Sequence, residues 1–282
     1  MSRVVPAALV AMTIASPVFA ADLPLKAPAA VPYVSGWNGW YVGGEVGGKW
    51  VTDDWGTNCI QLNPTDGCSH IKFTGAPDSS ASFKTSGVRG GVYAGAMFQV
   101  NPSWVFGIEG DYAFYKQSAS VAGIVGCITA ACLPTFFAPV TTAGDSTSVT
   151  NKDDFSLRLR GGFLVTPDIM VYGTGGLAFQ QVEATMSCGH SAPKSPACGI
   201  FHLSQTDGVW LPGWTVGGGV EWKLAQMGLP NWLIRGEYRY SDFGSWKPDF
   251  FRGSNVIEVF PDVRVKSQIA TAGIAYMFPV GQ

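Results

Sequence analysis

Charged residues are scarce in this sequence. Asp, Glu, Lys and Arg together make up 13% of its 282 residues, about half of the usual share. The formal charge of −2 argues against the basic surface that nucleic-acid binding requires. The G-x-S-x-G, Walker and H-E-x-x-H motifs of common enzymes are also missing. A soluble domain with so few charges would be hard to keep in solution, so much of the outer surface is expected to avoid water.

Long apolar runs are rare as well, and the first 20 residues contain the most suggestive one. Arg3 precedes an apolar stretch over residues 4–14, and small residues lead to Ala20. This order is typical of a secretory signal peptide cleaved after Ala20, although a membrane anchor interrupted by two prolines is the alternative. Residues 21–36 contain three prolines and are predicted to form a periplasmic tether. Residues 37–282 are predicted to form the folded domain.

Glycine and aromatic residues are abundant, and they occur in segments with a period of two. In residues 40–50, Trp40, Val42, Val46 and Trp50 share one face, while small and charged residues share the other. Eight segments follow this pattern: 40–50, 88–99, 104–114, 155–165, 169–180, 214–223, 232–240 and 267–278. An even number of alternating segments of this length predicts an all-β fold, an eight-stranded antiparallel up-and-down transmembrane β-barrel.

The connections between these segments alternate between short and long. Short turns contain Asn101-Pro102, residues 166–168 and the region of Gly228 to Pro230. The four long connections are predicted at Val51–Phe83, Gln117–Thr150, Ala184–Pro212 and Phe243–Asp262. Outer-membrane barrels have short periplasmic turns and long extracellular loops, so the four long connections are expected to face outside.

The outward face distinguishes a membrane barrel from a soluble lipocalin-type barrel, which would place its apolar face inside. Ten strand residues at a tilt near 40° climb roughly 25 Å, the height of a lipid-facing band. Aromatic residues near both ends of the apolar segments favour the lipid-facing interpretation. The predicted aromatic girdles contain Trp40, Trp50, Trp104, Trp214, Trp222, Trp232, Tyr240 and Tyr276.

Charged residues on the opposite faces are then expected to fill the lumen. An eight-stranded barrel is just wide enough for its own side chains, and a buried charge without a partner is costly. We therefore predict a narrow, charge-filled lumen with an ion network and no continuous pore. Its members would be Glu45, Lys49, Arg89, Glu109, Asp111, Arg158, Arg160, Glu221, Lys223, Arg235, Glu237 and Arg239.

The six cysteines fall into three close pairs, each within a predicted long loop and none on a predicted strand. Local disulfides are the simplest pairing for an exported chain. The pairs would be Cys59 with Cys68, Cys127 with Cys132, and Cys188 with Cys198. A zinc site at Cys188, His190, Cys198 and His202 is the alternative.

One uncharged segment, Val121–Val140, fits this arrangement poorly because its hydropathy resembles that of a membrane helix. Its glycines and prolines weaken a helix, so it is assigned to the second long loop. We expect its apolar tip, Ile124 to Phe137, to be available for adhesion or self-association.

Three stretches also resemble a known family. They are Ala21-Asp22-Leu23-Pro24 with Lys26, the glycine- and aromatic-rich run from Trp37 to Gly47, and the closing run Gly273-Ile274-Ala275-Tyr276-Met277-Phe278. They are similar to the outer-membrane immunogenic or porin-family proteins of alphaproteobacteria. The resemblance implies an OmpA-like barrel, here without a peptidoglycan-binding domain. It also implies that Gly273, Tyr276 and Phe278 form the signal for the outer-membrane insertion machinery.

Together these features predict an integral protein of the cell outer membrane with a structural and surface-interaction role. Its expected partners are outer-membrane lipid, lipopolysaccharide and surface or host molecules contacting its loops, with no nucleic acid. His70, His190 and His202 all fall in predicted loops, so no catalytic site and no cofactor or metal is expected. A small-solute channel is the first alternative, and a lipid-modifying enzyme is the second.

Overall fold

The computed structural model describes residues 36–61, 80–125, 145–189, 203–253 and 258–280. Most of these residues lie in nine strands: β1 (Gly39–Gln61), β2 (Ser80–Gln99), β3 (Trp104–Phe114), β4 (Gln117–Ala122), β5 (Ser146–Thr166), β6 (Ile169–Cys188), β7 (Leu203–Lys223), β8 (Trp232–Trp246) and β9 (Glu258–Pro279). A short 3₁₀ turn, η3 (Ala225–Met227), precedes β8. In these ranges we find no helix with the length and apolar character needed to cross a membrane.

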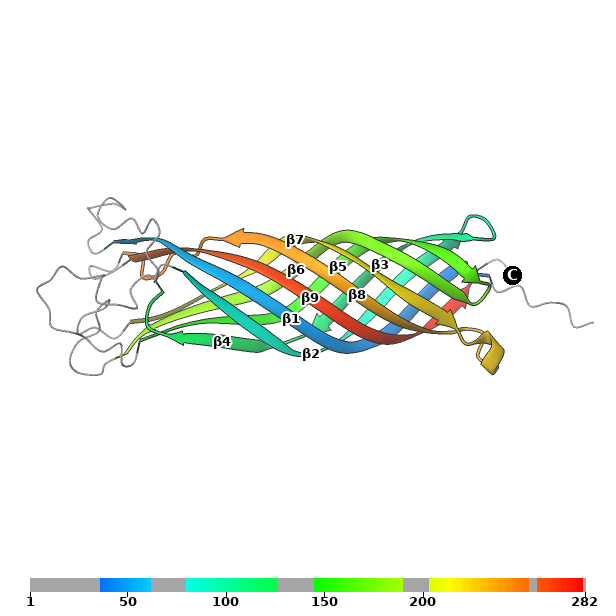
Figure 1. Cartoon of the computed structure of the whole chain (residues 1–282), viewed down its shortest axis with the longest axis horizontal. Helices are drawn as coiled ribbons and strands as arrows, with labels where there is room; N and C mark the ends of the chain where they lie inside the picture. The colour runs from blue at the N-terminus through cyan, green and yellow to red at the C-terminus, as the bar shows by residue number, and fades with distance from the viewer. Residues whose placement is uncertain (1–35, 62–79, 126–144, 190–202, 254–257, 281–282) are drawn as a thin grey trace, which may run out of the picture. The chain divides into compact units, whose positions relative to one another are not determined.

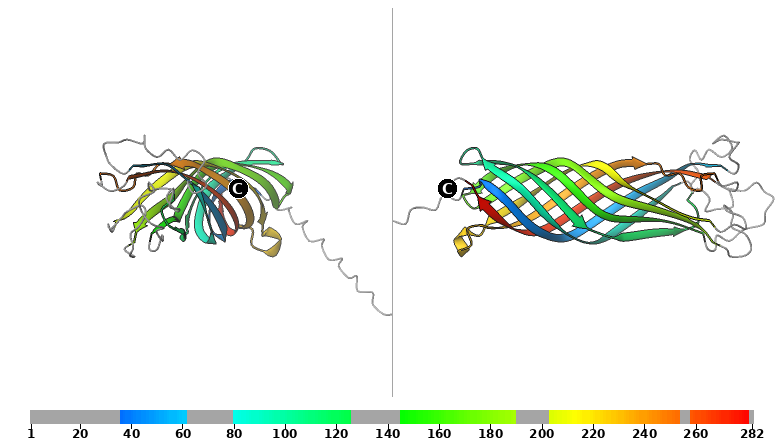
Figure 2. Two further views of the ribbon diagram at one scale, coloured as in Figure 1. Left: turned by 60° about the vertical axis from the view of Figure 1, so that its left-hand side comes forward. Right: turned by 180° about the vertical axis from the view of Figure 1, so that it is seen from behind.

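The strands form a closed antiparallel ring (Figures 1 and 2). Consecutive strands pair with each other except β3 and β4, and β1 also pairs with β9 to close the ring. β4 continues β3 after a break at Tyr115 and Lys116, and both pair with β5. The ring therefore has eight positions, which confirms the predicted eight-stranded transmembrane barrel fold. We call its two ends the short-turn end and the long-loop end.

The strands extend farther toward the long-loop end than predicted. β1 continues to Gln61 although a loop was expected from Val51, and β6 continues to Cys188 although a loop was expected from Ala184. On β1 the outward residues up to Trp50 are largely apolar, whereas the outward residues beyond it include Thr52 and Asp54. The alternation continues, but the outward residues are now polar and the inward ones apolar. A prediction that follows outward apolar residues therefore ends each strand too early.

Beyond this reversal the ring separates into two sheets. β2 pairs with β3 only over Gly90–Gln99, so Ser80–Arg89 pairs with β1 alone. β7 pairs with β8 only over Trp214–Lys223, so Leu203–Gly213 pairs with β6 alone. One sheet thus contains β2, β1, β9 and the end of β8, and the other contains β4, β5, β6 and β7. We call this part of the barrel the two-sheet extension.

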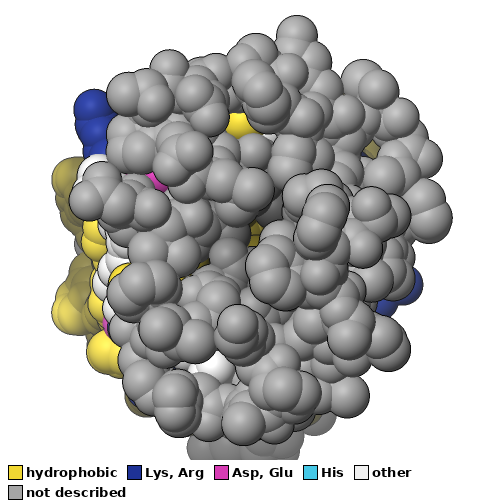
Figure 3. All heavy atoms as spheres, turned by 90° about the vertical axis from the view of Figure 1, so that its left-hand side faces the viewer, with side chains coloured by type: hydrophobic (Ala, Val, Ile, Leu, Met, Phe, Trp, Pro, Cys, Tyr) yellow, Lys and Arg dark blue, Asp and Glu magenta, His cyan; other side chains and the backbone are white. Residues whose placement is uncertain are grey.

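An apolar core fills the two-sheet extension. Trp55 stacks on Phe250 with ring centroids 6.0 Å apart and also contacts Phe83. We call this cluster the extension core; its buried residues include Val51, Trp55, Phe83, Tyr115, Val149, Val182, Met186, Phe243, Phe250, Val263 and Val265. The extension is thus apolar inside and polar outside, like a soluble β-sandwich. In the view onto the long-loop end, hydrophobic side chains show along one flank (Figure 3).

Candidate functional site

Between the two ends of the barrel, charged side chains from six strands fill the lumen. All of them are buried. We call this set the charged layer; its members are Glu45, Lys49, Arg89, Glu109, Asp111, Asp154, Arg158, Arg160, Glu221, Arg235, Glu237 and Arg239. The barrel's strand pairing places them on the inward face, opposite the apolar outer face.

Arg158 and Arg235 are central to this layer. Arg158 lies 2.5 Å from Glu109 and 2.6 Å from Glu237, measured from guanidinium nitrogen to carboxylate oxygen. Arg235 lies 2.6 Å from Glu109 and 2.7 Å from Glu45. Each guanidinium therefore joins carboxylates on two different strands through charge-assisted hydrogen bonds.

Asp154 completes the part of the layer nearest the long-loop end. Its carboxylate lies 2.6 Å from Lys49 Nζ and 2.8 Å from Arg89 Nη2. Arg89 also lies 2.5 Å from Asp111. The sequence prediction missed Asp154 because it precedes Phe155, the first outward apolar residue of its segment, and stands beside a register shift between Asn151 and Asp154.

Inward tyrosines also contact the charged layer, and the predicted ion network did not include them. The hydroxyl of Tyr41 donates to Glu109 at 2.7 Å, and that of Tyr172 donates to Glu237 at 2.8 Å. The guanidinium of Arg235 lies 3.4 Å from the ring centroid of Tyr93, a cation–π contact. The period of two places these three tyrosines on the inward face together with the lumen charges, so the alternation could have predicted them.

Glycines on neighbouring strands make room for the long charged side chains. Arg89 is opposite Gly47, and Arg239 is opposite Gly217. A Cβ atom at Gly217 would lie 2.6 Å from the backbone oxygen of Tyr238 and 2.7 Å from Cγ of Arg239. The inward glycines are therefore a steric requirement of the charged layer.

Lys223 is the one predicted network residue that the structure places elsewhere. Its ammonium group donates to the backbone oxygen of Gly36 and lies 5.0 Å from the ring centroid of Trp37. It therefore binds the chain entering the barrel at the short-turn end, apart from the charged layer.

Apolar side chains seal the short-turn end of the lumen. Trp37 is fully buried, and its indole nitrogen donates to the backbone oxygen of Pro167 at 3.0 Å. We call this cluster the end plug; it contains Trp37, Tyr41, Tyr93, Met97, Val105, Leu164, Met170, Tyr172, Leu233, Ala275 and Met277. The charged layer thus lies between the end plug and the extension core.

The outer face between the short turns and the extension is apolar, and we call it the apolar band. All eight predicted girdle residues lie on it, exposed or half-buried: Trp40, Trp104, Trp222, Trp232 and Tyr276 toward the short-turn end, and Trp50, Trp214 and Tyr240 toward the long-loop end. Tyr276 and Phe278, of the predicted assembly signal, pack together with ring centroids 5.0 Å apart, whereas Gly273 is opposite Glu45.

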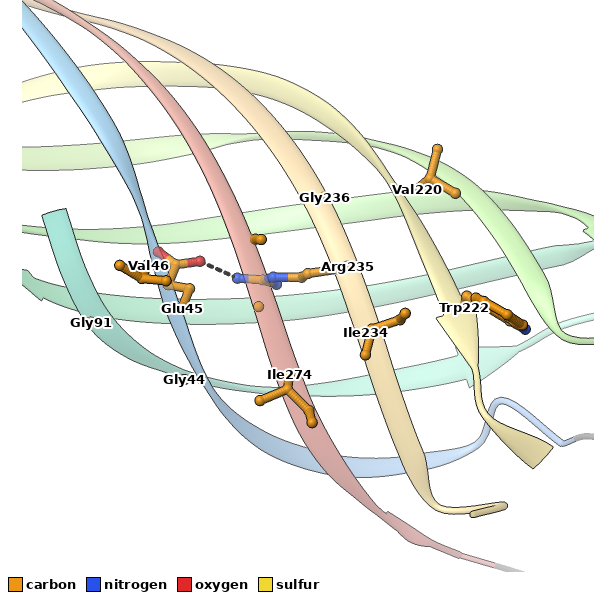
Figure 4. A pocket seen from close by; sticks show the side chains of 12 residues that line it. Gly44, Glu45, Val46, Gly91, Val220, Trp222, Ile234, Arg235, Gly236 and Ile274 are labelled. Atoms are coloured by element: carbon orange, nitrogen blue, oxygen red, sulfur yellow. Dashed lines mark hydrogen bonds and ion pairs between the residues drawn. The ribbon is translucent and has the colours of Figure 1, made fainter. Parts of the chain in front are cut away.

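A groove of about 800 Å³ opens on this outer face (Figure 4). Gly44, Gly236 and Ala272 are among the small residues that line it, beside larger residues such as Ile234 and Ile274. The Glu45–Arg235 ion pair lies on the lumen side of the wall behind it. The groove is an indentation of the apolar band.

Two cysteines correct the prediction that strands carry none. Cys59 lies on β1 and Cys188 on β6. Both are buried, and Cys188 belongs to the extension core. Neither is a free thiol. Cys68, Cys127, Cys132 and Cys198 lie outside the described residues, as do all three histidines, so the pairing stays a prediction and the zinc alternative is untested.

In the apolar segment Val121–Val140, the first two residues end strand β4 and the next three, 123–125, are buried. Ile124 and Val125 are fully buried in the extension core. The backbone oxygen of Val125 accepts a hydrogen bond of 2.5 Å from Thr57 Oγ1. The prediction that these two residues belong to an exposed adhesive tip is wrong. A strongly apolar stretch can pack into the core of the extension as readily as it can contact a partner. Residues 126–140 lie outside the described residues.

Comparison with known proteins agrees with this geometry. Residues 7–278 match the family model described as an outer membrane protein beta-barrel domain. The chain is 27% identical to the 31 kDa outer-membrane immunogenic protein of Brucella melitensis, over 99% of this chain and all of that protein. The same protein of Brucella suis matches equally.

Solved structures with the same fold include outer-membrane barrels. OprG from Pseudomonas aeruginosa is 15% identical, with a TM-score of 0.50 over 88% of this chain and 100% of that one. The outer membrane protease OmpT from Escherichia coli is 9% identical, with a TM-score of 0.50 over 86% and 97%. At these identities the likeness concerns the fold alone.

Proposed function

Because the chain belongs to the family of outer-membrane β-barrel domains, we propose that it is a closed barrel with a structural and surface-interaction role. The barrel stabilises itself in the membrane by its filled lumen and presents its long loops outside the cell. β1 continues about 11 residues beyond Trp50, which corresponds to roughly 25 Å of added height for a tilted strand. The two-sheet extension would therefore hold the loops above the lipid surface.

The observation that carries this proposal is the layering of the lumen. Six carboxylates of the charged layer, Glu45, Glu109, Asp111, Asp154, Glu221 and Glu237, all form ion pairs with lumen cations. Apolar clusters lie at both ends of this layer. An ion would have to break buried ion pairs and cross two apolar clusters, each of which is costly.

The small-solute channel is the alternative that this layering disfavours. Recording from refolded protein in planar bilayers of phospholipid alone distinguishes the two. We expect no steady conductance near the nanosiemens scale of a wide 16-stranded channel, and only small, rare openings. Steady conductance of the wild-type protein would refute the closed-barrel function.

A non-enzymatic role is part of the same proposal. The carboxylates of the charged layer are engaged in ion pairs and buried behind apolar clusters, so they are unavailable to a substrate. OmpT, a protease, shares the fold with this chain, and a fold by itself does not specify an activity. An altered lipid A mass profile in a strain lacking the protein would instead support the lipid-modifying enzyme.

Export and assembly complete the proposal. We expect cleavage after Ala20, which mass spectrometry of the mature N-terminus would establish. Gly273, Tyr276 and Phe278 would be read by the outer-membrane insertion machinery. The outward position of the Tyr276 and Phe278 rings on β9 supports this, since they would be accessible during assembly.

A further inference from the structure

The two sheets of the extension present different outer faces. On β4, β5, β6 and β7, outward hydroxyl groups pair across the strands. Ser118 and Thr150 lie 2.8 Å apart, and the hydroxyls of Thr185 and Thr206 are separated by the same distance. Ser187 and Ser204 form a third pair at 2.8 Å. We call the outer face of these four strands in the extension the hydroxyl face.

Strand register makes this face a regular array. Ser148 on β5 is opposite Ser120 on β4 and Thr185 on β6, and Thr185 is opposite Thr206 on β7. Four adjacent strands thus carry one continuous row of hydroxyls. With strands about 4.8 Å apart, the row is roughly 14 Å wide, and the rows repeat about every 6.7 Å along each strand.

The opposite sheet differs at the same height. Its outward residues include the charged Lys84 on β2, Asp54 on β1 and Lys266 on β9, beside the hydroxyls of Thr52, Ser80, Ser82 and Ser86. On the described hydroxyl face, the Lys152–Glu183 pair supplies charge of both signs at one edge. Both sheets thus carry outward hydroxyls, but they are arranged differently. On the opposite sheet charged residues stand between the hydroxyls, whereas the hydroxyl face aligns a row of four, Ser120, Ser148, Thr185 and Thr206, without a charge.

The hydroxyl face begins directly beyond an aromatic cluster of the apolar band. The rings of Phe155 and Phe179 stack with centroids 4.4 Å apart, and Trp210 lies 5.7 Å from Phe155. Trp210 is 41% exposed. A glycolipid whose acyl chains pack on the apolar band would therefore place its sugars against the hydroxyl face.

From this continuity we propose that the hydroxyl face binds the core oligosaccharide of lipopolysaccharide in the outer leaflet. The proposal rests on the orientation given under the proposed function, with the extension outside the cell. Ser and Thr hydroxyls both donate and accept hydrogen bonds, which matches the hydroxyls of a sugar chain. Trp210 adds an amphipathic ring at the boundary between lipid and sugar. A short row of sugars can follow one row of hydroxyls across the four strands.

The test compares three proteins refolded in vesicles. The first is the wild type, and the second carries Ser148→Ala, Thr185→Val and Thr206→Val on the hydroxyl face. The matched control carries Thr52→Val, Ser80→Ala and Ser86→Ala on the opposite sheet, and so loses the same number of outward hydroxyls. The vesicles contain phospholipid alone, phospholipid with lipid A, or phospholipid with rough lipopolysaccharide, which retains the core sugars. Heat-modifiable migration in phospholipid alone verifies that each variant folds.

Rough lipopolysaccharide should raise the unfolding temperature of the wild type and of the control more than lipid A does. The hydroxyl-face variant should lose most of this difference. The proposal would be overturned if that variant kept the full difference, if lipid A alone produced it, or if the control lost as much. The conductance test uses phospholipid alone, so its failure would contradict the closed barrel separately from this inference.

Discussion

Arg235 on β8 and Glu109 on β3 form an ion pair across the lumen, with 2.6 Å between Nη1 and Oε2. The two strands are not neighbours in the ring, and 126 residues separate the two positions. Glu109 also accepts hydrogen bonds from Arg158, Arg160 and Tyr41. One carboxylate therefore binds three guanidinium groups, two from the neighbouring strand β5 and one from β8 across the lumen.

Replacing Glu109 by Ala should lower the stability of the barrel strongly. Removing one partner of a buried ion pair costs about 3–5 kcal/mol, because the remaining charge stays buried, and here three arginines lose a partner. Glu237→Ala should cost less, since Glu237 pairs with Arg158 and Arg239. Both substitutions should also raise the conductance. Urea unfolding in vesicles and planar-bilayer recording measure these effects.

Glu183→Ala is the matched control for these substitutions. Glu183 pairs with Lys152 at the partly exposed edge of the extension, and such pairs contribute about 0–1 kcal/mol. Equal losses of stability in Glu109→Ala and Glu183→Ala would contradict the charged layer as the element that holds the lumen together.

A double-mutant cycle on Lys49 and Asp154 should reveal strong coupling. The pair is 2.6 Å apart and buried, so Lys49→Met alone leaves Asp154 with one cation, Arg89, and Asp154→Leu alone leaves Lys49 without its carboxylate. We expect a coupling free energy above about 1 kcal/mol. The same cycle on Lys152 and Glu183 should give less. Independent effects of the two substitutions at Lys49 and Asp154 would refute the assigned pairing.

Glycine positions should tolerate side chains on the outer face and reject them in the lumen. A Cβ at Gly217 would collide with the backbone of Tyr238, whereas one at Gly236 meets no atom within 4 Å. Gly217→Val should therefore abolish or severely reduce folding into the heat-modifiable form, while Gly236→Val should fold normally. Comparable folding yields for the two variants would show that the lumen is wider than the structure has it.

The polarity reversal on β1 predicts unequal roles for two of its tryptophans. Trp55 is buried in the extension core, while Trp50 is 50% exposed on the apolar band. Trp55→Ala should cost about 3–5 kcal/mol, the usual range for a buried Trp replaced by Ala. Trp50→Ala should cost less because lipid replaces the missing ring. Chemical unfolding in vesicles compares the two variants. A larger loss of stability for Trp50→Ala would contradict a change from a lipid-facing to a core-facing pattern between these two residues.

The sequence by itself determined the barrel and the composition of its lumen. Alternation over eight segments requires one face toward lipid and one toward the lumen, and it assigned Arg89, Glu109 and Arg158 to the lumen. Strand register follows from this period because a shift by one residue would expose every lumen charge to lipid. The same period also places the tyrosines on the inward face, but aromatic residues are so common on the outer face that their inward role was not recognised.

Only the tertiary structure decided where the membrane pattern ends and which charges pair. Beyond Trp50 the surroundings of the outer face change from apolar to polar, so the same alternation continues with Val51 and Trp55 inside. Nothing in the sequence near Trp50 indicates that the strand continues through this change. Asp154 and the Arg235–Glu109 pair likewise depend on ring closure, which brings distant strands to within the length of an arginine side chain.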